Sequence, residues 1–480
     1  MRINSKINPI TNHRTTKLLS QHDFILRFYL LKNKKKYSQL KVFFGKSLNM
    51  DFIGRRNFIK ATASTLALSA MPMYSSAKTK GSDTLKVAIV GSGRSGWKAI
   101  KALFKINYNT KIVAIADAFE DCAKQLHKKA SELANKYPNK TDIFDVPQSR
   151  IFVGLNAYKE AIESADIAVL ATPPVFRPQE VEFAIKHNKH VLMEKPICVD
   201  SVQARKMYEL ASVATQKKLT AISGVQRRYH KGYQEAIKRV QDGQIGEILY
   251  AQCYWFLSHF DGMDLKTHPE FDPEELEYQL RNWGLFTWTC GDHIVEQQVH
   301  NLDIMRWAFG RNPNFVSAIG GRRLNLPMPK YGNRFSHFSA EFDFGNDVRL
   351  FAQCRQEPNT APQVVERIVG TDGVMETSLF SKQIIKGKHN WQAPQVEDPI
   401  FEEYRTLVKS VRESSAINTI AEMTDACMYA ISARMSAYSG LKFKFDWALR
   451  KPKKSLLPEN LKFGKLPIEP LAISGEYKII

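Results

Sequence analysis

The sequence predicts an α/β protein with an N-terminal Rossmann domain, which is a doubly wound parallel sheet, and a C-terminal α+β domain with a large, mostly antiparallel open sheet. Three observations predict this fold class. Short apolar runs alternate with helical stretches between residues 85 and 193, as in β-α-β units. A glycine-rich turn follows the first apolar run. Longer strands of alternating polar and apolar residues appear after about residue 200, which is typical of antiparallel sheets.

The first domain is expected to hold parallel strands separated by helices. The expected strands are 85–90, 111–116, 151–153, 167–171 and 190–193, and the expected helices are 97–106, 118–137, 158–163 and 179–187. Ligands bind outside the carboxyl ends of such strands, so the segments that follow them are candidates for the functional site.

The second domain is expected to begin with a helix at 201–216 and a strand at 219–225. Alternating strands follow at 248–257, 315–320, 335–344 and 348–356. Gly345-Asn346-Asp347 indicates a hairpin between the last two, and a final helix at 418–439 ends at Gly440. We therefore predict a first domain at 81–200, a second domain at 201–449, and a C-terminal tail at 450–480.

The formal charge of +21 is concentrated at the N-terminus. Residues 1–80 hold 16 Lys and Arg against two acids, Asp23 and Asp51, and so carry +14. The remaining chain is only mildly basic, so nucleic acid is not expected as a partner.

A segment inside this basic region is similar to a twin-arginine export signal. Arg55-Arg56 precedes an apolar run at 61–71 and a cleavage-like Ser75-Ser76-Ala77. The run is too short for stable membrane insertion. We expect a periplasmic protein, with residues 1–49 as a non-native or disordered extension and 50–80 as signal and linker. The alternative is a basic tail on a cytoplasmic protein.

The six cysteines are scattered without a C-x-x-C pair. Neither a disulfide framework nor a zinc site is expected.

A G-x-G-x-x-G turn follows the first strand and opens a helix, where backbone N–H groups can bind a pyrophosphate. The second strand ends at Asp117, 21 residues after Gly96, in position to bind the adenosine ribose and to favour NAD over NADP. The alternative is that the glycines only shape a turn and Asp117 caps a helix. Arg94 could contact phosphate, which would weaken the NAD preference. The turn consists of Gly91, Ser92, Gly93, Arg94, Ser95 and Gly96.

Two further segments lie where parallel strands are expected to end. One contains Thr172 and Pro173, and the other contains Glu194 and Lys195. A lysine beside a nicotinamide could orient a substrate hydroxyl and stabilise charge as a hydride leaves its carbon. The alternative for an isolated lysine is a solvated surface charge.

The Glu194-Lys195-Pro196 triplet, the glycine turn and Asp117 together resemble the glucose–fructose oxidoreductase and inositol dehydrogenase (Gfo/Idh/MocA) family over residues 85 to 440. The resemblance implies oxidation or reduction of sugar and polyol hydroxyls, a C-terminal sheet that faces the cofactor, and a catalytic role for Lys195. It also implies that Thr172, Pro173, Glu194 and Lys195 lie at the cofactor.

The same resemblance implies a second catalytic segment, an acid four residues before a histidine. Glu296, His300 and Asp303 fit it and fall within one polar stripe of a helix. Many family members have Asp where this chain has Glu296, which leaves the part of Glu296 in proton transfer open. A solvated helix face is the alternative. His293, Glu296 and His300 could also be metal ligands, but nothing else completes a site, and no metal is expected.

Residues that could contact the substrate follow the strand at 219–225. Arg227, Arg228 and Tyr229 resemble the family segment that lines the cleft, and the alternative for the arginines is a surface ion pair. Trp283 and Trp288 could stack on a sugar or pack in the core.

We therefore expect an NAD-dependent oxidoreductase in which His300 takes a proton from a sugar hydroxyl and Lys195 holds that oxygen. Residues 81–200 are then the NAD-binding domain, and 201–449 the substrate-binding and catalytic domain. An exported enzyme should bind its cofactor tightly. Two alternatives stay open: a glycosidase or lyase-like enzyme that uses transient oxidation, and a non-catalytic nucleotide-dependent sensor. A homo-oligomer through the C-terminal sheet is expected.

Overall fold

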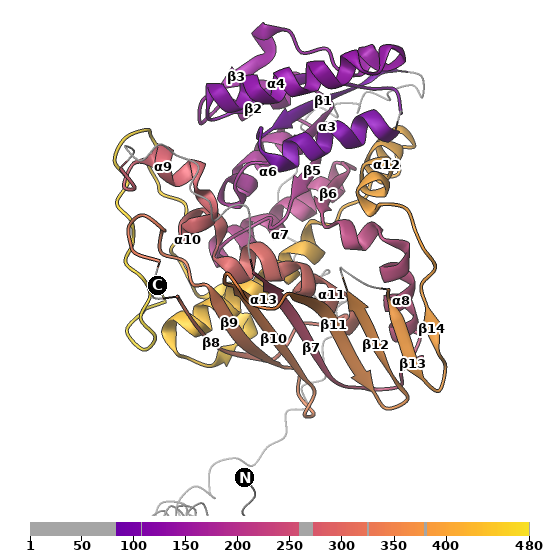
Figure 1. Cartoon of the computed structure of the whole chain (residues 1–480), viewed down its shortest axis with the longest axis vertical. Helices are drawn as coiled ribbons and strands as arrows, with labels where there is room; N and C mark the ends of the chain where they lie inside the picture. The colour runs from indigo at the N-terminus through magenta and orange to yellow at the C-terminus, as the bar shows by residue number, and fades with distance from the viewer. Residues whose placement is uncertain (1–82, 107, 259–271, 324–325, 379–381, 480) are drawn as a thin grey trace, which may run out of the picture. The chain divides into compact units, whose positions relative to one another are not determined.

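The computed structural model describes residues 83–106, 108–258, 272–323, 326–378 and 382–479 (Figure 1). The predicted extension and twin-arginine signal at 1–80 lie outside these residues. In the described ranges, no helix is both long and apolar enough to cross a membrane.

The first sheet has six parallel strands in the order β3-β2-β1-β4-β5-β6, and this confirms the predicted doubly wound sheet. Strand β6 was expected in the second domain, so the sheet extends beyond the predicted boundary at residue 200. The strands are β1 (Leu85–Val90), β2 (Thr110–Asp117), β3 (Ile151–Val153), β4 (Ile167–Leu170), β5 (His190–Glu194) and β6 (Ala221–Gly224).

Helices cover both faces of this sheet, which explains why its strands are almost continuously apolar. In β1, Val87 and Ile89 belong to one buried cluster, whereas Ala88 and Val90 belong to another. The first cluster includes α3 (Arg94–Ile106) and α4 (Glu120–Asn135), and the second includes α5 (Tyr158–Glu163), α6 (Arg177–Lys186) and α7 (Ser201–Gln216).

A helix from the C-terminal part of the chain completes the first core. Helix α12 (Pro399–Arg412) packs on α3, and its Tyr404, Leu407 and Val408 are buried in the same cluster as Ile89. After α12 the chain pairs with β6, because the Ala221 N–H donates to the Ile417 carbonyl at 2.8 Å. Residues far apart in the sequence therefore share one core.

The second sheet has nine strands in the order β14-β13-β12-β11-β7-β10-β9-β8-β15. All neighbours are antiparallel except β10 and β7, which confirms the mostly antiparallel sheet. Its strands are β7 (Ile248–Leu257), β8 (Phe315–Gly321), β9 (His337–Asp343), β10 (Arg349–Gln356), β11 (Gln363–Gly370), β12 (Gly373–Ser378), β13 (Ile384–Gly387), β14 (Trp391–Gln392) and β15 (Phe443–Lys444).

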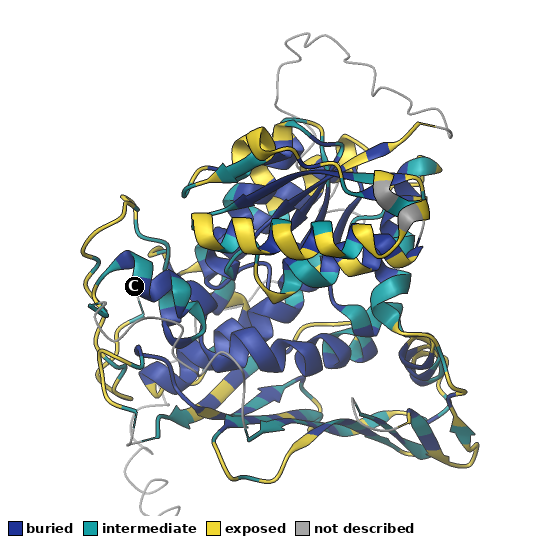
Figure 2. Cartoon of the chain, turned by 45° about the horizontal axis from the view of Figure 1, so that its top comes forward, coloured by how far each residue is buried: buried dark blue, intermediate teal, exposed yellow. Residues whose placement is uncertain are grey.

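One face of the second sheet is covered by α8 (Lys231–Gln241), α11 (Val299–Phe309) and α13 (Ile420–Ser439). Figure 2 shows these buried helices on one side of the strands, with exposed and partly buried residues along the strands themselves. On the open face, Ile319 is 74% exposed and Phe351 is 41% exposed. Two large apolar side chains are thus left in solvent on neighbouring parts of one surface.

Candidate active site

The glycine turn is shaped by close backbone contacts. Gly91 has φ +100°, and a Cβ there would lie 2.6 Å from the Ala171 carbonyl carbon. A Cβ on Gly96 would lie 2.1 Å from the Gly91 oxygen, whereas one on Gly93 would meet nothing within 4 Å. The first and third glycines therefore allow tight packing, and the second leaves space at the start of α3, as a bound pyrophosphate requires.

Asp117 joins this turn to the end of β2. Its carboxylate accepts hydrogen bonds from the N–H groups of Ser92 at 2.7 Å and Phe119 at 3.0 Å. Burial raises the pKa of Asp117, although both hydrogen bonds oppose this shift. The buried Ser92 hydroxyl also lies at this carboxylate and lowers its pKa. Asp117 and Ser92 are therefore held together beside the open Gly93, where a dinucleotide would lie.

A cavity of about 350 Å³ lies at the carboxyl ends of β1, β2 and β4, where the strand order reverses and ligands bind in this fold. It has the size of a small-molecule site. Its lining includes Gly91, Ser92, Gly93, Asp117, Thr172 and Pro173, and also Leu280, Arg281 and Trp283 from the segment after β7. Arg94, Ser95 and Gly96 lie just behind it in the first turn of α3.

A buried arginine fixes the expected strand-end residues. Arg177 donates to the Thr172 carbonyl at 2.7 Å, to the Glu180 carboxylate at 2.9 Å and to the Glu194 carbonyl at 3.2 Å. The Glu194 carboxylate forms an ion pair with Lys98 of α3. Glu194 therefore turns toward α3, and its neighbour Lys195 points the other way, toward the second sheet.

Lys195 reaches the segment before α11. Its Nζ donates to the main-chain oxygen of Glu296 at 2.5 Å and to its Oε1 at 2.9 Å. Glu296 lies in a π-helical turn, Ile294–Gln298, that precedes α11. The predicted continuous α-helical stripe is therefore interrupted, as is frequent at functional sites. Both side chains are largely buried, at 12% and 7% exposure, so two of the expected catalytic residues are brought together.

His300 lies in the first turn of α11 against β7. Its ring stacks on Trp255, with centroids 5.2 Å apart and an interplanar angle of 18°. Burial, followed by the charges of Lys195 and Arg227, holds the pKa of His300 well below its ordinary value. The imidazole is therefore neutral near pH 7 and can accept a proton.

Arg227 is buried beside this stack. It forms an ion pair with Glu366 of β11 and lies 5.5 Å from the Trp255 ring centroid. Its Nε and one terminal nitrogen have no partner among the described residues, so Arg227 retains donors close to His300. That is compatible with the predicted substrate contact.

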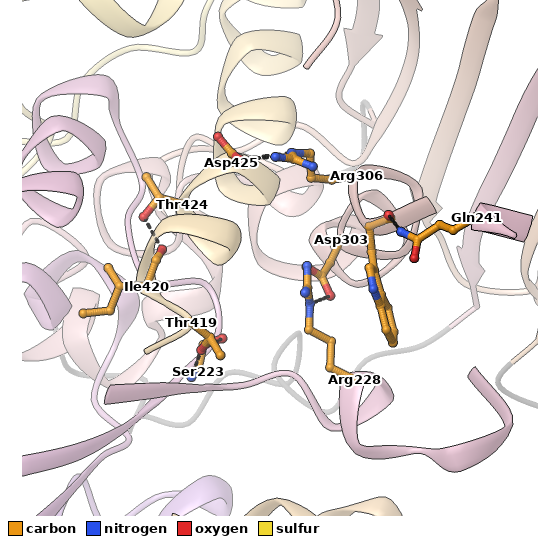
Figure 3. A network of polar contacts seen from close by, with 10 residues as sticks. Ser223, Arg228, Gln241, Asp303, Arg306, Thr419, Ile420, Thr424 and Asp425 are labelled. Carbon is orange, nitrogen blue, oxygen red and sulfur yellow. Dashed lines mark hydrogen bonds and ion pairs between the residues drawn. The ribbon is translucent and has the colours of Figure 1, made fainter. Parts of the chain in front are cut away.

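Arg228 and Asp303, both candidates for the substrate site, pair with each other. The Arg228 Nε and a terminal nitrogen donate to the Asp303 carboxylate at 2.7 to 3.0 Å (Figure 3). Asp303 belongs to the buried side of α11, and its side chain is only 1% exposed. Tyr229 packs against the core of the first sheet. The three residues hold the two domains together around the site.

Trp255, which stacks on His300, was not predicted as a site residue. Trp255 could have been found, because the alternation in 248–257 places it on the inward face with Ala251 and Cys253. Trp283 lines the cavity, whereas Trp288 donates to Gln279 at 2.7 Å. His293 is buried, and burial holds its pKa well below the ordinary value. Within the described ranges, no three His, Cys, Asp or Glu side chains form a candidate metal site.

Similar proteins share this arrangement of domains. The inositol 2-dehydrogenase/D-chiro-inositol 3-dehydrogenase of Halalkalibacterium halodurans is 26% identical over 373 residues, which cover 75% of this chain and 95% of that protein. The 2,7-anhydro-N-acetylneuraminate hydratase of Escherichia coli is 29% identical over 174 residues, covering 35% and 40%. The chain spans 60% of the length of the inositol 2-dehydrogenases from Salmonella that it matches.

The fold is also that of solved structures. A levoglucosan dehydrogenase in complex with NADH and levoglucosan matches with a TM-score of 0.60 at 13% identity, over 76% of this chain and all of that one. Two family models match the sequence. Residues 85–221 match the oxidoreductase family, NAD-binding Rossmann fold, and residues 237–427 match the oxidoreductase family, C-terminal alpha/beta domain. Because the two models cover most of the chain, the protein belongs to the Gfo/Idh/MocA oxidoreductase family.

Proposed function

We propose that the protein is an exported NAD-dependent oxidoreductase that acts on a hydroxyl-bearing carbon of a sugar, glycoside or polyol. The observation that carries this proposal is the convergence of Lys195, Glu296 and His300 at the edge of the parallel sheet. The names of the relatives, inositol and levoglucosan dehydrogenases, support the substrate class. NAD is the expected cofactor and NADP the less favoured one, because Asp117 lies at the end of β2.

The chain's own groups perform the proton transfer. The neutral imidazole of His300 accepts the hydroxyl proton, because burial keeps it unprotonated. The ammonium of Lys195, held by two oxygens of Glu296, donates to the hydroxyl oxygen and stabilises the charge that develops on it. Bound NAD would supply the hydride acceptor. Gly91, Gly93, Ser92 and Asp117 would hold it.

The test is a panel of sugars and glycosides, read out by the absorbance of bound reduced cofactor. Lys195→Met should slow reduction by about 10²-fold or more while cofactor stays bound. Lys206→Met, which removes an exposed lysine of α7 paired with Glu182, is the matched control and should react normally. Normal turnover by the Lys195 variant would exclude the proposed mechanism.

A second candidate is cleavage of a glycoside with no net oxidation. The similarity to a hydratase favours it, because adding water changes no overall oxidation state. The same His300 and Lys195 would remove and return protons, one hydride would pass to bound NAD and back, and one water would replace the leaving alcohol. The net reaction would be hydrolysis of a glycosidic bond. Release of an aglycone without accumulation of reduced cofactor would identify this reaction.

Export and tight binding of the cofactor belong to the same proposal. The twin-arginine-like segment supports a periplasmic location, where little free NAD is available. Sequencing the N-terminus of the mature protein tests it, because a start upstream of Ala77 would exclude cleavage after the signal.

A homo-oligomer through the second sheet is also proposed. Ile319, in register with Ser339 of β9, and Phe351, in register with Glu341, lie on its open face. Burying these side chains against a second copy would remove apolar surface from water.

A further inference from the structure

Part of the cavity wall comes from outside the nucleotide-binding domain. Leu280 and Arg281 of α9 (Leu276–Arg281), with Trp283, line the same cavity as the glycine turn and Asp117. Parallel-sheet sites are normally open at the carboxyl ends of the strands. Here a later segment of the chain closes one side.

Arg281 ties this segment to the first domain. Its terminal nitrogens donate to both oxygens of Asp121 at 3.0 Å, and its Nε donates to Glu277 at 2.8 Å. The guanidinium carbon also lies 4.0 Å from the centroid of the Phe119 ring. Asp121 and Phe119 directly follow β2 and line the cavity themselves. A bidentate ion pair and a cation–π contact thus join the two sides of the cavity.

The C-terminal tail accepts hydrogen bonds from α9. The Leu276 N–H donates to the Gly464 carbonyl at 2.9 Å, and Gln279 Nε2 donates to the Leu466 carbonyl at 2.6 Å. The Phe463 ring lies 6.0 Å from Phe119. The sequence pattern of the tail predicted none of this. We call residues 276–283 and 463–466 together the cover.

We infer that the cover retains the adenosine half of the dinucleotide, and that Arg281 is a cofactor-retaining residue supplied by the second domain. This inference rests on the proposed function. The cavity at Asp117 and the glycine turn is where the adenosine half binds in this fold. A bound dinucleotide could leave on this side only after the Arg281–Asp121 contact opens. Because the contact is closed in this structure, entry on this side requires the same opening, so the contact slows both association and dissociation.

The size of the expected change in the release rate follows from the exposure of the Arg281–Asp121 ion pair. The Arg281 side chain is 19% exposed, but Asp121 is 66% exposed, and exposed ion pairs contribute little. The cation–π contact with Phe119 and the contacts of the C-terminal tail add to the contribution of this ion pair. We expect a change of about fivefold in the rate of release, rather than loss of binding.

The experiment measures release of NADH from the loaded full-length protein after mixing with excess NAD, followed by NADH fluorescence. Arg281→Met should accelerate release about fivefold or more, and Arg281→Lys, which keeps charge without the bidentate geometry, should have an intermediate effect. Asp121→Asn leaves Arg281 in place and serves as a second variant if the first unfolds.

Arg405→Met is the matched control. Arg405 of α12 is paired with Glu402 and is 33% exposed, away from the cavity, so its loss should leave release unchanged. Unchanged release in both the Arg281 and Asp121 variants would overturn the role of the cover and leave the proposed function intact. Failure of the unmodified protein to bind NADH or NAD would overturn both.

Discussion

Lys195 Nζ contacts Glu296 through two different oxygens, the main-chain carbonyl at 2.5 Å and the carboxylate at 2.9 Å. The two residues belong to different domains and are 101 positions apart in the chain. The carbonyl oxygen is available because the π-helical turn at 294–298 disturbs the regular pattern of helical hydrogen bonds. The ammonium is therefore fixed by backbone as well as by side chain.

Glu296→Gln should reduce kcat about tenfold to a hundredfold, with little change in KM. The amide keeps the size of the side chain and removes its charge, so Lys195 stays near the carbonyl but is less well oriented. Glu296→Asp, which keeps the negative charge on a shorter side chain, should recover part of the rate. Single-turnover reduction of bound cofactor measures this. An equal fall in the Gln and Asp variants would contradict a role for the charge.

The rate of cofactor reduction should stay constant from pH 8 down to about 6 and fall only at more acidic pH. Burial and the nearby positive charges lower the pKa of His300 in the folded protein. Below pH 6.5, the ordinary pKa of histidine, the His300 imidazole binds a proton in the unfolded protein but not in the folded protein. The free energy of unfolding therefore also falls as the pH falls. A half-maximal rate at pH 6.5 would contradict the shift. His389→Asn, in an exposed turn, is a control for the stability measurement.

Glu403→Gln should stabilise the protein at pH 8.5 more than at pH 5. The Glu403 carboxyl of α12 is fully buried and has no hydrogen-bond partner among the described residues. Burial raises its pKa to about 8, although the positive charge of Lys98 opposes this shift. Between pH 4.5 and 8 the folded carboxyl keeps a proton that the unfolded one loses, so stability falls as pH rises. Thermal unfolding at both pH values measures this, and Glu413→Gln, at the exposed end of α12, should change nothing.

Arg228→Met should destabilise the protein by about 2 to 4 kcal/mol, because it leaves the buried Asp303 carboxylate without its partner. The estimate lies below that for a fully buried pair, since Arg228 is 17% exposed. The double variant with Asp303→Asn should regain most of the loss. Urea unfolding of the four proteins in the cycle measures the coupling. Additive losses would show that the pair is not coupled.

Ile319→Asp combined with Phe351→Glu should convert the proposed oligomer to monomer without lowering the unfolding temperature. These side chains are exposed on the open face of the second sheet, so the folded monomer loses no packing. Light scattering after size-exclusion chromatography measures the mass. A monomeric unmodified protein would refute this interface.

The sequence predicts the parts of the site that depend on local patterns. The glycine turn, Asp117 and Lys195 each follow a buried strand, and a strand end sets their position. Contacts that depend on tertiary packing were not predictable. A π-helical turn is not visible in the periodicity around Glu296, and Arg281 lies 160 residues from Asp121. Strand β11 was missed because a charged residue, Glu366, takes one of its buried positions and breaks the alternation. Strand β12 has only six residues.

The packing of α12 against α3 has a consequence for synthesis of the protein. The apolar side of the nucleotide-binding sheet that faces α3 stays incompletely covered until Tyr404, Leu407 and Val408 have left the ribosome. Domains generally fold from the N-terminus during translation, but this first domain can finish only after most of the second has been made. A fragment ending near residue 220 should therefore aggregate, and chaperones should be needed longest at the beginning of the chain.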